Sequence, residues 1–181
     1  MGALIVIVVV VVVVAVVAGV IMAGVQRRRS QALREHFGSE YDRAVERTGG
    51  RREGESDLRE RLDERKQLDI RPLAPAARES YTSEWQRVQG EFVDTPDLAL
   101  AEADTLVHRV MRDRGYPMDD FDHQASLISV DHPDVVKNYR EAHDTYLVSA
   151  QGAAETERQR QGLLSYRALF DELLADEPAA T

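Results

Sequence analysis

Hydrophobic and polar positions divide the chain into one long apolar segment and several amphipathic segments that follow it. From Ala3 to Val25 no side chain is charged or polar, and residues 8–14 are seven consecutive valines. A helix over this segment extends roughly 35 Å, enough to cross a hydrocarbon core of about 30 Å. In lipid the backbone must satisfy its own hydrogen bonds, which outweighs the modest helix propensity of valine. The pattern predicts a transmembrane anchor in residues 1–25, with its span at about 3–25.

Beyond residue 71, four segments repeat apolar side chains at the three- and four-residue spacing of one helix face. These positions are Ala77, Tyr81, Trp85, Val88 and Phe92; Leu100, Ala103, Val107, Val110 and Met111; Val135, Tyr139, Ala142 and Tyr146; and Leu163, Tyr166, Phe170, Leu173 and Leu174. A short helix is predicted from about Asp119 to Leu127. No segment alternates with the period of a strand, so no sheet is expected. We therefore predict an all-α fold, with an acidic up-down bundle of four main helices and one short helix over residues 71–177, and a flexible tail at 178–181.

Residues at the ends of these segments predict where the helices begin and end. Thr95 and Pro96 suit the N-cap and the first position of the second bundle helix, and Gly115 suits its end. Thr156 and Gln159 match a T-x-x-Q capping box at the start of the last helix. We therefore expect short connections between the bundle helices.

Residues 26–70 differ from the bundle because they are highly charged and contain few apolar side chains. They hold 12 basic and 11 acidic residues. Apolar residues at four-residue steps predict that the first helix continues to about Thr48, where a pair of glycines interrupts it. Ser56 suits the N-cap of a short charged helix that reaches about Leu68. We interpret this zone as a charged juxtamembrane helical stalk, or linker, rather than a core-bearing domain.

The charges that flank the apolar segment predict its orientation. Arg27, Arg28 and Arg29 follow the segment directly, and no lysine or arginine precedes it. By the positive-inside rule, the N-terminus lies outside and the C-terminal domain lies in the cytoplasm. A cleaved signal peptide is the weaker interpretation, because a basic n-region is missing and the apolar stretch exceeds the usual ~7–15 residues. The predicted localisation is the cell membrane, in a single pass, with the lipid bilayer as a partner.

Small residues lie on one face of the predicted span. Ala15, Gly19 and Ala23 are spaced four residues apart. This spacing lets two membrane helices approach closely, so the span is a candidate site of homodimerisation. The alternative is that alanine and glycine are simply frequent in membrane helices.

Charge and composition restrict the class of partner. The chain has 181 residues, a net charge of −9 and no cysteine, which removes disulfides, thiolate metal sites and cysteine nucleophiles. Residues 71–181 carry 21 acidic side chains against 11 basic ones. This excess argues against nucleic-acid binding and would speed association with a basic protein partner. Acidity is also an ordinary route to solubility, so it identifies no partner by itself.

Motifs for catalysis and metal binding are sparse. Asp104 and His108 lie four residues apart on one predicted helix, a spacing that presents two ligands to one metal, and His143 lies on another helix. These three are candidate metal ligands, although the paired Glu-x-x-His signature of carboxylate-bridged bundles is missing. Residues 119–123 also gather aspartates and a histidine, but carboxylates are typical of helix starts. The sequence has no phosphate-binding loop, G-x-S-x-G or H-E-x-x-H motif, so no enzyme activity, catalytic residue or cofactor is predicted.

Several short motifs in the bundle region resemble those of a known family. They are Trp85-Gln86-Arg87-Val88-Gln89, Phe92-Val93-Asp94, Arg114-Gly115-Tyr116-Pro117, Ser129-Val130-Asp131-His132-Pro133 and Tyr139-Arg140-Glu141-Ala142-His143. Over residues 71–175 they resemble a family of bacterial, actinobacterial-type single-span membrane or secreted proteins to which no function is assigned. The resemblance implies a bacterial source and one coherent domain, and it implies no activity.

Three functional hypotheses follow. The leading one is a membrane-anchored, non-catalytic interaction or scaffold module that binds a protein partner. The second is a metal-binding bundle, an enzyme or a sensor, that uses Asp104, His108 and His143. The third is an envelope-stress component that faces outside, which requires the opposite orientation.

Overall fold

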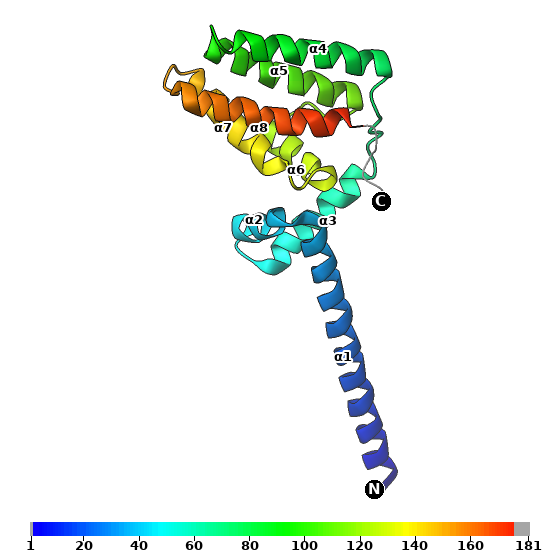
Figure 1. Ribbon diagram of the computed structural model, residues 1–181. Coiled ribbons are helices and arrows are strands. Elements are labelled where there is room, and N and C mark those ends of the chain that lie inside the picture. Colours follow the sequence, from blue (N-terminus) through cyan, green and yellow to red (C-terminus); the bar gives the residue numbers. More distant parts are fainter. Residues whose placement is uncertain (1, 176–181) are drawn as a thin grey trace. The chain divides into compact units, whose positions relative to one another are not determined.

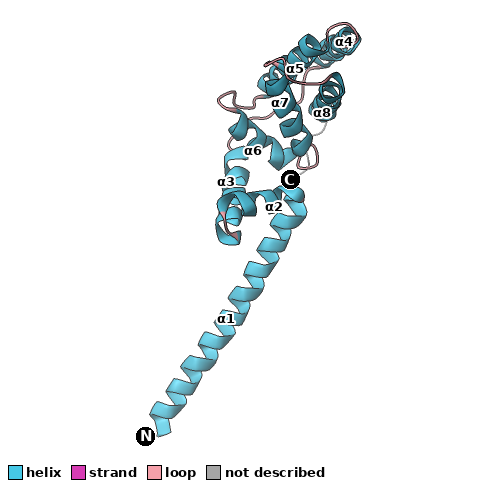
Figure 2. Cartoon of the chain, turned by 90° about the vertical axis from the view of Figure 1, so that its left-hand side faces the viewer, coloured by secondary structure: helices cyan, strands magenta, loops and turns pink. Residues whose placement is uncertain are grey.

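The computed structural model describes residues 2–175, with the backbone alone for residues 3–15 (Figure 1). It divides into two compact units, Met1–His36 and Phe37–Thr181. Within the described residues all regular structure is helical, with eight α-helices and no strand (Figure 2). The predicted all-α fold and helical bundle are therefore confirmed.

The described part of the first unit is helix α1 (Gly2–Phe37) without its last residue, and it contains the predicted span and the three arginines after it. Of the helices as far as they are described, none is long and apolar enough to cross a membrane. The side chains of residues 3–15, including Ala15, lie outside the described residues, whereas Gly19 and Ala23 are described and exposed. The transmembrane anchor and its dimerisation face therefore stay predictions.

The helix predicted to run to Thr48 is interrupted ten residues earlier than expected. Helix α1 ends at Phe37, and α2 (Ser39–Thr48) begins after Gly38. Gly38 has a φ of 51°, a backbone conformation that glycine adopts without the steric cost paid by other residues. The prediction of one continuous helix is wrong at this point, because the four-residue apolar spacing continues across the break.

Helices α2 and α3 (Arg51–Arg65) pack against each other and bury apolar side chains between them. Tyr41, Ala44 and Leu58 are buried, and the Tyr41 hydroxyl donates a hydrogen bond to Glu55 Oε1 over 3.0 Å. Helix α3 begins at Arg51, so Ser56 lies inside the helix and the predicted N-cap there is wrong. This part of the zone interpreted as a stalk thus has a small core, which the low number of apolar residues did not indicate.

Five helices form the bundle. They are α4 (Pro75–Glu91), α5 (Pro96–Arg114), α6 (Phe121–Asp131), α7 (Val136–Ser149) and α8 (Thr156–Leu174). Helix α5 packs against α4 and α8, and α7 packs against α8 (Figure 1). Every apolar face predicted from the sequence is buried in this core or packed against it. At its centre, the rings of Trp85 and Phe170 stack with centroids 4.7 Å apart.

The helix ends follow the sequence signals only in part. Gly115 ends α5 as predicted, with a φ of 102°. Thr95 is the N-cap residue of α5 and Pro96 its first residue, as predicted, but the Thr95 hydroxyl donates to the Glu91 carbonyl and makes no capping hydrogen bond. Thr156 is the first residue of α8 after Glu155, so the predicted capping box does not form. Threonine has acceptors in the preceding turn, and this competes with a capping role.

Candidate functional site

The structure brings the three sequence-predicted metal candidates together around the carboxylate of Asp104. Asp104 lies on α5 and is buried. Its Oδ2 is 3.2 Å from Nδ1 of His108, and its Oδ1 is 3.6 Å from Nδ1 of His143 on α7. The Tyr166 hydroxyl, on α8, donates a hydrogen bond of 2.5 Å to Oδ1. Three bundle helices therefore meet at this carboxylate.

The imidazole of His108 already has an acceptor at each nitrogen. Nδ1 lies 2.9 Å from the backbone oxygen of Asp104, and Nε2 lies 3.3 Å from the hydroxyl oxygen of Tyr139. The Tyr139 hydroxyl in turn donates to Gln124 Oε1 over 3.2 Å. Both ring nitrogens of His108 are thus engaged by groups of the protein. The use of Asp104, His108 and His143 as metal ligands stays a prediction.

The ionisable groups of this network stabilise each other's charges. Burial alone would raise the pKa of Asp104, but hydrogen bonds from His108 and His143 outweigh it and lower the pKa. Burial alone would lower the pKa of His108, but its hydrogen bond to Asp104 outweighs this and raises the pKa. Burial also raises the pKa of Tyr139 and Tyr166, which keeps both hydroxyls protonated. The centre of the bundle is thus a network of one carboxylate, two imidazoles and two tyrosine hydroxyls.

His143 connects this network to an open groove of about 490 Å³. We call it the α2–α7 groove, because α2, the start of α6 and α7 supply its walls. Residues lining it include Glu40, Arg43, Phe121, Arg140, His143 and Leu147. The Phe121 and His143 rings stack nearly parallel, with centroids 3.7 Å apart. The groove therefore offers a flat aromatic pair between charged side chains.

A buried carboxylate at the floor of the groove ties α2 to the bundle. Glu40 accepts a hydrogen bond of 2.6 Å from Arg140 on α7, and its other oxygen is 3.6 Å from Arg61 on α3. Arg61 also donates to the Ser129 hydroxyl on α6 over 3.0 Å and pairs with Asp57 at 2.7 Å. Buried ion pairs of this kind need several partners to offset their desolvation. The α2–α3 pair is thus attached to the bundle mainly through charged contacts.

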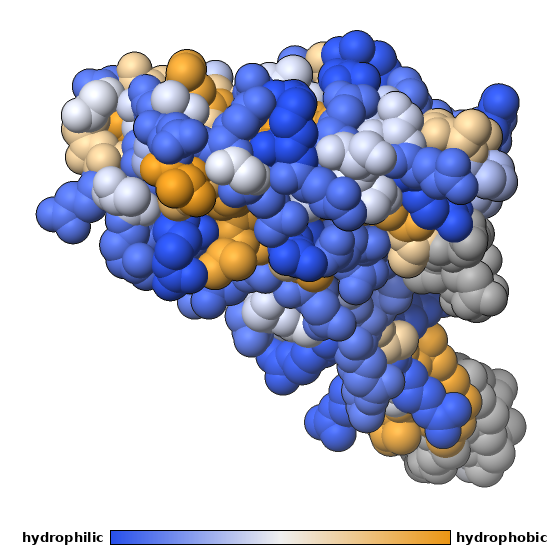
Figure 3. Space-filling view, turned by 45° about the horizontal axis from the view of Figure 1, so that its top comes forward, coloured by the Kyte–Doolittle hydropathy of each residue, from blue (hydrophilic) through white to orange (hydrophobic). Residues whose placement is uncertain are grey.

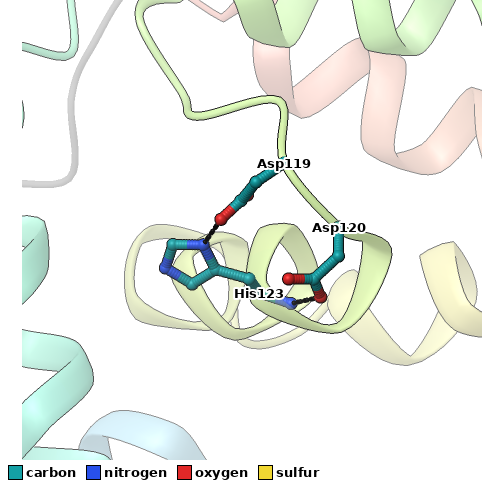
Figure 4. A group of neighbouring side chains, drawn as sticks. All are labelled: Asp119, Asp120 and His123. Atoms are coloured by element: carbon teal, nitrogen blue, oxygen red, sulfur yellow. Dashed lines mark hydrogen bonds and ion pairs between the residues drawn. The ribbon is translucent and has the colours of Figure 1, made fainter.

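A second group of titratable side chains lies at the start of α6 (Figure 4). Three potential metal ligands meet there, with ligand atoms within 4.8 Å of one another: Asp119, Asp120 and His123. They form the one such group of three found among the described residues. Asp120 is the N-cap of α6, accepting a hydrogen bond of 2.9 Å from the His123 backbone N–H. Burial lowers the pKa of His123, but hydrogen bonds to Asp119 and Glu64 outweigh this and raise it. The sequence showed these residues in one segment, where they were interpreted as helix-start carboxylates.

Several residues of these sites were not singled out by the sequence. Tyr139 and Tyr166 were predicted as apolar core positions, and their hydroxyls proved to be part of the network around Asp104. A tyrosine in place of phenylalanine on a buried face is the one signal that points to a hydrogen-bond partner there. For Glu40 and Arg140, which are 100 positions apart, no local signal exists.

Comparison with known proteins finds none that is similar to this chain. The chain matches no family model, no curated protein and no solved structure. The class of protein that the structure defines is thus an all-helical bundle with an N-terminal helix. The family resemblance inferred from the sequence motifs stays a prediction.

Proposed function

We propose that this chain is a single-pass membrane protein whose second unit is a non-catalytic interaction module in the cytoplasm. The observation that carries the proposal is the uncharged segment Ala3–Val25, followed at once by Arg27, Arg28 and Arg29 and then by a separate helical unit. A segment of this length and composition is long enough to cross a bilayer. The arginines favour the cytoplasmic side.

The arrangement of ionisable groups supports an interaction role rather than catalysis. A catalytic residue needs a group directed at a substrate, with its pKa near the working pH. In the bundle centre, the carboxylate of Asp104 faces the imidazole of His108, and the Tyr166 hydroxyl donates a hydrogen bond to the same carboxylate. The same pattern recurs at Glu40, between two arginines. These groups stabilise the packing of the helices.

The surface of the second unit supports binding of a protein with basic side chains. The face shown in Figure 3 is mostly hydrophilic, with hydrophobic side chains in small separate areas. One exposed hydrophobic side chain, Leu147, lines the α2–α7 groove. Because residues 71–181 carry an acidic excess, a basic partner would be attracted over long range.

The orientation is tested with two reporters, each fused separately after Thr181. We expect fluorescence from a cytoplasm-only reporter and no activity from a periplasm-only phosphatase. Phosphatase activity without fluorescence would overturn the cytoplasmic assignment and favour the envelope-stress hypothesis. Loss of membrane association of the unfused chain on alkaline extraction would overturn the anchor itself.

The interaction surface is tested by photo-crosslinking in cells at two exposed leucines. Leu147 lines the α2–α7 groove, whereas Leu164 is equally exposed on α8 and does not line it. We expect a discrete crosslinked species from position 147, weakened by high salt, and none from position 164. Equal products at both positions, or none at either, would rule out the groove as the partner site. A crosslink that salt does not weaken would contradict a basic partner.

A further inference from the structure

The start of α6 holds three potential metal ligands within one turn. His123 Nδ1 lies 2.5 Å from Asp119 Oδ2, and Asp120 lies between them in sequence. Asp120 uses Oδ1 as the N-cap of α6, so its Oδ2 remains the atom to meet a cation. Figure 4 shows the carboxylate of Asp119 directed at the imidazole of His123, and that of Asp120 at the backbone nitrogen of the same residue. One nitrogen and two oxygen ligand atoms thus lie within 4.8 Å of one another.

A fourth side chain, from a distant part of the chain, orients the imidazole. Glu64 lies on α3, 59 positions before His123, and its Oε1 is 2.8 Å from His123 Nε2. In metal sites, a ligating histidine usually donates its second N–H to a carboxylate, which fixes the ring and makes the other nitrogen a better ligand. Glu64 meets Nε2 on one side, while Nδ1 faces Asp119 on the other. The packing of α3 against α6 creates this arrangement.

We propose that Asp119, Asp120 and His123 bind one divalent cation of the zinc class, with Glu64 as a positioning residue for His123. The cation takes the place of the proton between Nδ1 and Asp119. This inference goes beyond the proposed interaction function and does not depend on the membrane anchor.

The ligand set defines the class of metal. An imidazole nitrogen suits Zn²⁺ and Co²⁺, whereas Mg²⁺ and Ca²⁺ prefer sites built from oxygen alone. Three protein ligands leave at least one position of a tetrahedral ion open. The side chains of Asp119 and Asp120 are exposed, so water fills that position or a ligand from a partner occupies it.

The Asp104 network is the natural comparison, because it has the same Asp–His spacing of four residues. There the second nitrogen of His108 meets a tyrosine hydroxyl rather than a carboxylate, and the carboxylate of Asp104 is already shared with Tyr166. At α6, both nitrogens of His123 face carboxylates, and the ligands are open to solvent. A cation can therefore reach the α6 site without disrupting the core.

The test uses the full-length chain, purified in detergent, with Zn²⁺ measured by calorimetry and Co²⁺ by its visible absorption. We expect one saturable Zn²⁺ per chain. His123→Gln and Asp119→Asn should each weaken binding at least tenfold, and Glu64→Gln should weaken it about tenfold. The matched control is Asp122→Asn, which removes the same charge from the same turn but is outside the ligand group. It should change the affinity less than threefold.

Further readouts separate a positioning role for Glu64 from a structural one. Glu64→Gln should alter the Co²⁺ absorption spectrum while the unfolding midpoint of the metal-free chain stays the same. His108→Gln should leave the stoichiometry of one unchanged, because it alters the Asp104 network only. The proposal is overturned if no saturable binding occurs, or if His123→Gln binds Zn²⁺ as the original chain does. It is equally overturned if Asp122→Asn weakens binding as much as Asp119→Asn, or if Mg²⁺ and Ca²⁺ bind as tightly as Zn²⁺.

Discussion

Replacing Gly54 by alanine tests how closely α2 and α3 approach. A Cβ at Gly54 would lie 2.8 Å from Cα and 2.9 Å from the backbone nitrogen of Val45. Carbon atoms in contact prefer separations of about 3.5–4.0 Å, so the two helices would have to separate by roughly 1 Å. Overpacking of this kind costs about 1–3 kcal/mol, while replacing a helical glycine by alanine returns about 0.5–1 kcal/mol. We expect Gly54→Ala to lower the free energy of unfolding by about 1 kcal/mol.

The matched control is Gly90→Ala in α4, where an added Cβ meets no atom within 4 Å. This variant should gain about 0.5–1 kcal/mol from helix propensity alone. The two variants should therefore differ by about 2 kcal/mol, or roughly 4–8 °C in unfolding midpoint for a unit of this size.

The measurement is thermal and urea unfolding of the full-length chain, followed by circular dichroism, with amide exchange to locate the change. Exchange should speed up in α2 and α3 for Gly54→Ala and stay unchanged there for Gly90→Ala. If both variants stabilise the chain equally, the close contact between α2 and α3 is refuted. That result would favour the stalk interpretation based on the sequence.

Three further variants test the buried groups. Trp85→Ala removes a buried ring stacked on Phe170, so unfolding should become easier by about 3–5 kcal/mol, measured by urea titration. Glu40→Gln leaves Arg140 charged without its partner, so the free energy of unfolding should fall by about 3 kcal/mol. Adding Arg140→Gln should recover part of this loss, and no recovery would contradict the pairing. His132 is buried, and burial is the main reason that its pKa is lowered in the folded chain. The unfolded chain therefore binds this proton more tightly, so His132 should contribute a slope in which stability falls as the pH drops below about 6.5, by at most about 1.4 kcal/mol per pH unit; His108 and His123, whose pKa values are raised, contribute the opposite slope. His132→Asn should flatten this slope in urea titrations between pH 7.5 and 5, and an unchanged slope would disprove the assignment.

The sequence by itself determined which faces of the bundle helices are buried. Trp85, Val107 and Phe170 were placed in the core by spacing alone, and Gly115 was identified as a helix end. These predictions succeed because the apolar side chains of a buried helix face recur every three or four residues in the sequence. The position of the N-cap at Thr95 was predicted correctly, but its hydrogen bond was not, because a threonine hydroxyl also has acceptors in the preceding turn.

The tertiary structure decided how those faces meet and which polar side chains pair. The contact of Gly54 with Val45, the Glu40–Arg140 pair and the Glu64–His123 pair all join residues whose own neighbourhoods give no sign of the partner. For Asp104 and His108, which the sequence offered only as candidate metal ligands, packing decided that tyrosine hydroxyls contact their side chains. The period of apolar side chains predicts only that a position is buried. The identity of its neighbour depends on helix crossing and register, which are set by the packing of the whole unit.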